Sequence, residues 1–258
     1  MGVACNLNAD IGEGFGAYDI GDDTALLDIV QSVNVACGFH AGDPGTMKRL
    51  VSDADARGVS IGAHPGFNDL WGFGRRRIEM APRDLEYMVA YQIGALQAMA
   101  AYGSQKVTHV KPHGALNNMA AEDEALAMAI GRAIKTVDDS LIFVALAGSE
   151  LEKAAERLDL PLAREGFADR QYEADGNLVS RKIEGSVYKD PATALTQVLR
   201  MVADGEIVAR DGSTLKRKVD TVCIHGDEPS AVALGAKVRA GLEEAGIGLK
   251  TLPELALA

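Results

Sequence analysis

The chain has 258 residues, 47% of them hydrophobic, which is enough for one large α/β domain with a substantial core. Its 37 acidic residues outnumber its 26 Lys and Arg residues, and the net charge of −11 disfavours binding to nucleic acid or to an anionic membrane. The three cysteines are widely spaced and fit neither a disulfide framework nor a zinc ribbon, so we expect reduced thiols in a cytoplasmic protein. The sequence shows no signal peptide and no apolar run near the ~20 residues of a membrane span.

Short β-like runs alternate with helical patterns along the chain. In chain order, strands are predicted at residues 4–10, 33–38, 59–64, 106–112, 141–146, 161–167 and 221–225. Apolar residues three and four apart predict helices at residues 45–57, 82–102, 123–137, 149–158, 191–203 and 231–245. This alternation, without a linker, predicts one α/β domain over residues 1–258, built as a doubly wound sheet or as a closed β/α barrel. The polar content of the strands favours a TIM-like, seven-stranded barrel.

Two stretches interrupt the alternation. Residues 65–80 are rich in Gly, Phe and Arg, and residues 168–189 carry alternating polar side chains around a glycine. Loops of this length in a compact domain are usually functional lids or small hairpins. We therefore expect both stretches to lie near a functional site.

The first predicted strand has one entirely polar face. Alternation with a period of two places Asn6, Asn8 and Asp10 on the same side, opposite apolar neighbours. A first strand followed by a helical crossover is normally covered on both sides, so buried polar groups there need partners. The pattern favours a functional site, and the alternative is a solvated or purely structural face.

Four of the five histidines stand at the carboxyl ends of predicted strands: His40, His64, His113 and His225. In a β/α barrel, active sites are built at that rim. The fifth, His109, lies inside its strand, and we interpret it as a structural residue.

The turns around these histidines are rich in glycine, proline and acids. Such turns bring side chains close to a small ligand. Asp10 and Glu13, three residues apart, are acid/base candidates there, although Glu13 could merely cap a turn. Carboxylate and imidazole together could also hold a divalent metal, and the sequence leaves the two chemistries open. Arg75 begins a run of three arginines that could clamp a carboxylate or form a solvated charged surface.

Several motifs, in order along nearly the whole chain, closely resemble those of the LamB/YcsF lactam-utilisation family. They lie at residues 6–13 (NLNADIGE), 34–43 (NVACGFHAGD), 62–65 (GAHP), 73–75 (FGR), 110–114 (VKPHG), 165–172 (EGFADRQY), 175–179 (DGNLV) and 223–227 (CIHGD). The resemblance implies a barrel of the glycoside hydrolase/deacetylase kind. It also implies a subunit that works with two other subunits of a 5-oxoprolinase to convert 5-oxo-L-proline to L-glutamate with ATP hydrolysis.

The nucleotide is expected to act through the partner subunits. The chain has no Gly-Lys pair and hence no P-loop, so no binding loop of that kind is available for ATP. The sequence leaves open whether the chain also forms a homo-oligomer.

Under this resemblance, each candidate residue receives a role. The candidate catalytic residues are Asp10, Glu13, His40, His64, His113 and His225. The candidate substrate-binding residues are Asn6, Asn8, Asn34, Asp43, Arg75, Lys111, Arg170 and Asp227. If a divalent metal is used, Asp10, His40 and His64 are its expected ligands. One departure concerns substrate fit, because Asn117 stands where the family pattern has a tyrosine.

Two other functions remain open from the sequence. The first is a stand-alone metal-dependent amide hydrolase or deacetylase, which stoichiometric metal and turnover without ATP would favour. The second is a non-catalytic regulatory subunit that binds a small acid. Rim variants that lose ligand binding without a catalytic defect would favour it.

Overall fold

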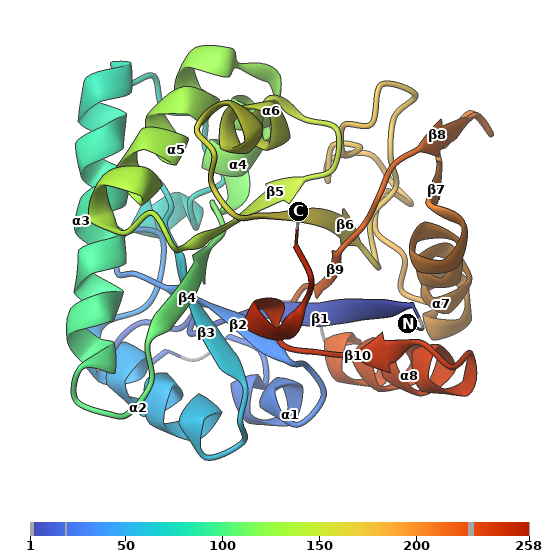
Figure 1. Cartoon of the computed structure of the whole chain (residues 1–258), viewed down its shortest axis with the longest axis horizontal. Helices are drawn as coiled ribbons and strands as arrows, with labels where there is room; N and C mark the ends of the chain where they lie inside the picture. Colours follow the sequence, from blue (N-terminus) through green and yellow to red (C-terminus); the bar gives the residue numbers. More distant parts are fainter. Residues whose placement is uncertain (1–2, 19, 227–229, 258) are drawn as a thin grey trace.

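Seven parallel strands close into a barrel in the computed structural model, which describes residues 3–18, 20–226 and 230–257 (Figure 1). The strands are β1 (Ala4–Ile11), β2 (Ser32–Ala36), β3 (Ser60–His64), β4 (Val107–Val110), β5 (Ile142–Leu146), β6 (Leu162–Phe167) and β9 (Thr221–Ile224). Each strand pairs with the next in this order, and β9 pairs with both β6 and β1. The predicted seven-stranded β/α barrel is therefore confirmed.

Helices surround the barrel (Figure 1). Six of them match the predicted helices: α2 (Pro44–Asp55), α3 (Pro82–Ala100), α5 (Glu124–Val137), α6 (Glu150–Arg157), α7 (Pro191–Leu199) and α8 (Ala231–Glu244). A π-helical turn, η2 (Arg200–Asp204), continues α7. Two helices, α1 (Asp23–Leu27) and α4 (Gly114–Glu122), were not predicted. The 5 residues of α1 show too little periodicity, and α4 begins with a glycine and carries two adjacent asparagines, which are weak helix formers.

The two irregular stretches both contribute residues to the carboxyl end of the barrel. The first contains a 3₁₀ turn, η1 (Leu70–Gly72), and the second is tied by isolated bridges, including one from Arg170 to Val187. A small antiparallel hairpin, β7 (Glu206–Val208) with β8 (Thr214–Lys216), was not predicted. Its strands are three residues each, too short for a clear alternating pattern.

The barrel has a polar interior and an apolar outer surface. On β1, Leu7 and Ala9 are fully buried against the helical layer, while Asn6 and Asn8 are fully buried inside. The polar groups find partners on the neighbouring strands: Asn6 Nδ2 donates to Ser32 Oγ of β2 at 2.8 Å, and Thr221 Oγ1 of β9 donates to Asn6 Oδ1 at 2.7 Å. The polar face of the first predicted strand therefore points inward and is hydrogen-bonded, as buried polar groups must be.

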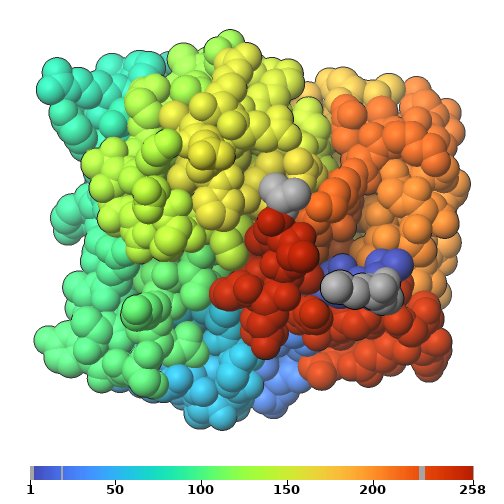
Figure 2. Space-filling view, in the orientation of Figure 1, coloured from blue at the N-terminus to red at the C-terminus, as the bar shows by residue number. Residues whose placement is uncertain are grey.

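The C-terminal segment covers the amino end of the barrel. Strand β10 (Gly248–Leu249) pairs with the start of β1. The turn η3 (Leu252–Glu254) follows, and Leu252 packs against an apolar cluster of Ile142, Val144 and Ala163. Figures 1 and 2 show this segment, in red, at the centre of that face. The site described below opens at the opposite, carboxyl end.

The three cysteines are free thiols and all are buried. Among the described residues, no helix combines the length and apolar character that a membrane span requires.

Candidate functional site

A cavity of about 460 Å³ lies at the carboxyl ends of the strands. It collects acids, imidazoles and cations from different βα units: Asp10, Glu13, His64, His113, His225, Arg75, Lys111, Arg170, Arg181 and Lys182. This is the end of a β/α barrel at which active sites form. The cavity volume suits a small organic molecule.

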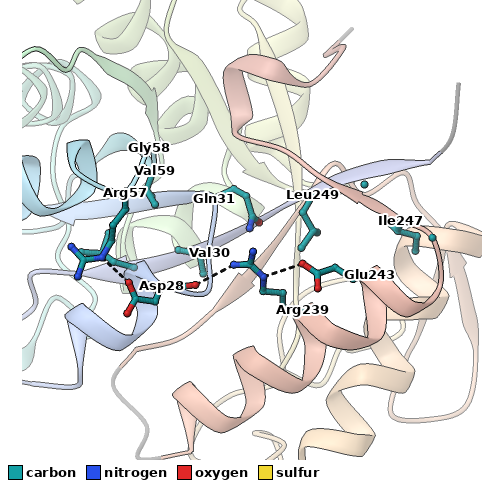
Figure 3. Close-up of a pocket in the computed structure, with 13 residues that line it drawn as sticks. Asp28, Val30, Gln31, Arg57, Gly58, Val59, Arg239, Glu243, Ile247 and Leu249 are labelled. Atoms are coloured by element: carbon teal, nitrogen blue, oxygen red, sulfur yellow. Dashed lines mark hydrogen bonds and ion pairs between the residues drawn. The ribbon is translucent and has the colours of Figure 1, made fainter.

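A second hollow, of about 690 Å³, lies at the amino ends of the strands (Figure 3). Its charged side chains are paired with one another or with the backbone. Arg57 Nε lies 2.7 Å from Asp28 Oδ1, and Arg239 Nε lies 3.1 Å from Glu243 Oε1. Because no imidazole or thiol joins these pairs, we assign the chemistry to the smaller, carboxyl-end cavity.

A buried charge network forms the floor of that cavity. Lys111 Nζ lies 2.9 Å from Asp10 Oδ1, 2.9 Å from Glu165 Oε1 and 3.0 Å from Cys223 Sγ. Burial pushes the pKa of Asp10 upward, but the nearby His64 and Lys111 outweigh burial and hold that pKa well below its usual range. Burial would lower the pKa of Lys111, but its acidic neighbours raise it well above the usual value. Asp10 is therefore an ionised carboxylate held in place by an ammonium group.

The predicted asparagines lie deeper in the barrel than the cavity lining. Asn34 Nδ2 donates to Asp10 Oδ1 at 2.9 Å and to Asn8 Oδ1 at 2.7 Å, while Asn8 Nδ2 donates to Glu165 Oε1 at 3.0 Å. Asn6 lies one layer further down. These amides orient the carboxylates from below.

Asp43 has a different position. It is the N-cap of α2, where its carboxylate accepts from the backbone of Gly45 and Thr46, and it also accepts from the backbone N–H of Gly16. Asp43 does not appear among the residues that line the cavity. It therefore orders two rim loops.

Three imidazoles and a carboxylate gather on one side of the cavity. One ligand-type atom from each of Glu13, His40, His64 and His113 lies within 4.8 Å of the others. His113 Nδ1 lies 3.0 Å from His64 Nε2 and 3.5 Å from Glu13 Oε1. Burial lowers the pKa of His113 to about 3, and that of His40 falls well below its usual value for the same reason. This group is hereafter called the histidine cluster.

Backbone shape in the first irregular stretch makes room for the histidine cluster. A side chain at Gly66 or Gly74 would overlap the ring or Cβ of His40. Phe73 adopts a left-handed conformation with φ of 53°, and its carbonyl oxygen lies 2.8 Å from His113 Nε2. A non-glycine residue in that conformation is strained, and such strain is typical of functional sites.

A histidine–aspartate pair stands near the opposite wall. His225 Nδ1 lies 2.8 Å from Asp169 Oδ1, and the His225 ring stacks on Phe167 with ring centroids 5.2 Å apart. A carboxylate on Nδ1 fixes the tautomer, so Nε2 carries the lone pair and can accept a proton. His225 also forms a second group of metal-ligand type with Asp10 and Cys223.

Arg170 provides a buried cation that faces the cavity. Its side chain is 5% exposed, its Nη2 donates to Val179 O at 2.5 Å, and its Nε has no hydrogen-bond partner. Burial, followed by the charge of Arg181, lowers its pKa to about 10, so it stays protonated at neutral pH. A buried donor without a partner is costly, and an anionic ligand would satisfy it.

The arginine run separates into residues with different positions. Arg75 lines the cavity, with its guanidinium carbon 5.0 Å from the centre of the Phe73 ring. Arg76 forms an ion pair with Asp69. Arg77 is exposed. Arg75 is therefore placed where it could clamp a carboxylate, whereas Arg77 belongs to a solvated charged surface.

The structure thus brings most of the candidate residues together. Asp10, Glu13, His64, His113, His225, Arg75, Lys111 and Arg170 line the cavity. His40 lies behind them in the histidine cluster, and Asp227 lies outside the described residues. Asn117, the departure from the family pattern, also lines the cavity, on α4.

Sequence reasoning missed three members of the site: Glu165, Asp169 and Cys223. Glu165 is a charged residue inside a predicted buried strand, a signal that could have identified it. Asp169 stands two residues beyond the end of the same strand, where barrel active sites form. Cys223 is the first residue of the CIHGD motif at residues 223–227, a position that could have identified it.

Comparisons with known proteins agree with this geometry. The sequence model of the LamB/YcsF family matches residues 5–257. A protein from Bradyrhizobium diazoefficiens that is named as a 5-oxoprolinase subunit is 56% identical over 243 residues, which cover 94% of this chain and 95% of that protein. The crystal structure of a lactam utilization protein from Thermus thermophilus has a TM-score of 0.91 and 42% identity, and covers 96% of this chain and 99% of that one.

A more distant structure shares the fold alone. The catalytic domain of a peptidoglycan N-acetylglucosamine deacetylase from Eubacterium rectale aligns with a TM-score of 0.50 at 11% identity, over 96% of this chain and 87% of that one.

Proposed function

Because the chain belongs to the LamB/YcsF family, we propose that it is a subunit of a 5-oxoprolinase whose carboxyl-end cavity opens the lactam of 5-oxo-L-proline to give L-glutamate. The proposal assigns to this chain the function that the name of the Bradyrhizobium relative describes. One observation carries it: a single small cavity contains both acid/base groups and a buried guanidinium whose Nε has no hydrogen-bond partner.

The substrate's chemistry matches this cavity. 5-Oxoproline has one carboxylate and one cyclic amide. Arg170, supported by Arg75, would bind the carboxylate, because guanidinium groups recognise carboxylates bidentately. Asp10, Glu13 and the cavity histidines would then move protons at the amide.

The remaining predicted residues would act through these groups. Lys111 and Asn34 hold Asp10 in its ionised form. Asn8 and Asn6 continue this hydrogen-bond network deeper into the barrel. Asp43 orders the loops above. In this proposal Lys111 is a positioning residue, since Asp10, Glu165 and Cys223 already accept its three hydrogens.

ATP would enter through two partner subunits. A five-membered lactam is a stable amide, and transfer of a phosphoryl group to its oxygen makes the ring carbon more reactive toward water. Water would then add to that carbon and the C–N bond would break, with the nitrogen leaving as the amine of γ-glutamyl phosphate. A second water would hydrolyse this acyl phosphate to L-glutamate and phosphate, so that one ATP becomes ADP and phosphate. The absence of a P-loop from the sequence supports placing the nucleotide on a partner. The need for ATP also supports a cytoplasmic location.

The histidine cluster favours a second candidate, a stand-alone metal-dependent amide hydrolase. A divalent metal there would polarise an amide carbonyl or activate water. The shared fold with a deacetylase is compatible with this candidate but does not select it.

The decisive measurement is glutamate release from 5-oxoproline by the purified chain, with and without ATP and the two partner subunits. We expect release only with all components, and its loss in Asp10→Asn. Arg170→Gln should raise KM about 10- to 100-fold through loss of a charge-assisted contact, whereas Arg49→Gln, on the outer face of α2, should match wild type. Amide hydrolysis without ATP would favour the second candidate, and no glutamate under any combination would refute the lactamase proposal.

A further inference from the structure

Two nitrogen atoms face each other at the centre of the histidine cluster. His64 Nε2 lies 3.0 Å from His113 Nδ1. The other nitrogen of each ring is committed to a backbone carbonyl, at 2.7 Å from Lys111 O for His64 Nδ1 and 2.8 Å from Phe73 O for His113 Nε2. A carbonyl oxygen only accepts, so those outer nitrogens carry the hydrogens. In the neutral rings, both facing nitrogens therefore present lone pairs.

Two lone pairs at this distance repel unless a positive species lies between them. A shared proton is one such species, and it would turn one of the two buried rings into an imidazolium, which costs desolvation free energy. A metal cation satisfies both lone pairs without protonating either ring.

Two further donor groups converge on the same point. His40 is fully buried, and neither of its ring nitrogens has a hydrogen-bond partner. Glu13 Oε1 lies 3.9 Å from His40 Nε2 and 3.5 Å from His113 Nδ1. Ligand atoms of a tetrahedral ion with bonds of 2.0–2.1 Å are about 3.3 Å apart. The separations in the histidine cluster lie on both sides of that value.

We propose that Glu13, His40, His64 and His113 bind one transition-metal ion of the Zn²⁺ class, with His64 coordinating through Nε2 and His113 through Nδ1. Imidazole donors favour Zn²⁺, Co²⁺, Ni²⁺ or Fe²⁺ over Mg²⁺ and Ca²⁺. This set keeps His40 and His64 from the sequence prediction and replaces Asp10 by Glu13 and His113. Asp10 Oδ1 is bonded to Lys111 and Asn34, and Asp10 Oδ2 lies 3.5 Å from His64 Nε2, but Asp10 groups with Cys223 and His225 and not with all four members of the histidine cluster. The proposal holds whether or not the chain acts on a lactam.

Metal titration of the full chain tests the proposal. Protein stripped with a chelator is titrated with Zn²⁺ and, separately, with Co²⁺, whose visible absorption reports its coordination. We expect one equivalent of each to bind, an intense low-coordinate Co²⁺ spectrum, and no competition from millimolar Mg²⁺. Glu13→Gln and His113→Gln should weaken binding at least about 10- to 100-fold. His225→Asn, which alters the neighbouring group, should retain wild-type affinity.

Three results would overturn the proposal. The first is the absence of stoichiometric Zn²⁺ or Co²⁺ binding. The second is loss of binding in His225→Asn with retention in His113→Gln. The third is a pair of ¹⁵N NMR spectra of the wild type, without and with Zn²⁺, in which neither His64 Nε2 nor His113 Nδ1 changes its chemical shift. The NMR measurement needs no variant, so it remains decisive even if a substitution prevents folding. Circular dichroism of each variant separates lost binding from lost structure.

Discussion

Lys111 controls the charge of the barrel interior at the scale of a single residue. Its ammonium lies between the carboxylates of Asp10 and Glu165, and its side chain is 3% exposed. A buried ion costs several kcal/mol unless it is paired, and two carboxylates left without their cation would also repel each other. The same contact that stabilises the fold keeps Asp10 ionised at the cavity floor.

Replacing Lys111 with methionine should therefore destabilise the protein. We expect Lys111→Met to lower the free energy of unfolding by about 3–5 kcal/mol, measured by urea denaturation at neutral pH. The matched control is Lys153→Met, which removes an exposed ion pair with Glu150 and should cost less than about 1 kcal/mol. Equal effects of the two substitutions would contradict this account of the network.

In the proposed reaction, Asp169 would act through His225, whose Nδ1 lies 2.8 Å from its carboxylate. Because it fixes the tautomer of that ring, Asp169→Asn should lower kcat about 10²- to 10⁴-fold while KM stays within a few-fold of wild type. Steady-state glutamate formation by the assembled enzyme measures both constants. Asp138→Asn, at the half-buried end of α5 and outside the cavity lining, serves as control. A rise in KM with unchanged kcat would show that the pair binds substrate instead.

At the scale of the element, β3 carries a glycine that makes room for a neighbouring ring. A Cβ at Gly62 would overlap the imidazole of His109, which comes from β4 and is fully buried. His109 Nδ1 lies 2.8 Å from Thr108 Oγ1, and burial lowers the His109 pKa to about 3. His109 thus fills the barrel, in agreement with its interpretation as a structural residue.

This packing predicts opposite effects for two glycine substitutions. Gly62→Ala should lower the free energy of unfolding by about 1–3 kcal/mol, because the core is already filled. Gly94→Ala, in α3, meets open space and should raise it by up to about 1 kcal/mol through helix propensity. Thermal and urea unfolding check both signs. A neutral Gly62→Ala would mean that the His109 ring has room to move.

At the scale of the whole molecule, the C-terminal segment closes the barrel opposite the cavity. Leu252 is fully buried against residues from β5 and β6, and its backbone N donates to Ser32 Oγ at 3.2 Å. The last residues of the chain thereby contact both halves of the barrel (Figure 2). This closing segment and the candidate site therefore lie at opposite ends of the barrel, as is typical of β/α barrels.

Truncating Leu252 tests this closure. We expect Leu252→Ala to lower the free energy of unfolding by about 2–5 kcal/mol, the usual range for a buried leucine that leaves a cavity. Leu70→Ala, at a position 38% exposed, should change it by no more than about 0.5 kcal/mol. A cost below about 1 kcal/mol for Leu252→Ala would show that the segment only rests on the barrel.

Much of the architecture was predictable because it depends on neighbours in sequence. The apolar periodicity predicted all seven barrel strands and six of the helices, and the alternation along β1 correctly placed Asn6, Asn8 and Asp10 on one face. Histidines at strand ends predicted the rim, because parallel strands bring their carboxyl ends to one side. Helix α1 and the β7–β8 hairpin carried too few residues for a periodic signal, and α4 begins with weak helix formers.

Sequence alone determined the order of strands and helices, the polar interior and the residues that gather at the rim, because these follow from periodicity and from motifs read locally. Only the tertiary structure decided which atoms meet. Asn8 bonds to Glu165, 157 residues away, and Lys111 to Asp10, 101 residues away. It also decided which nitrogens of His64 and His113 face each other, because that choice follows from carbonyl groups supplied by other loops. Such contacts depend on how closing the barrel brings distant segments together, and no local pattern encodes them.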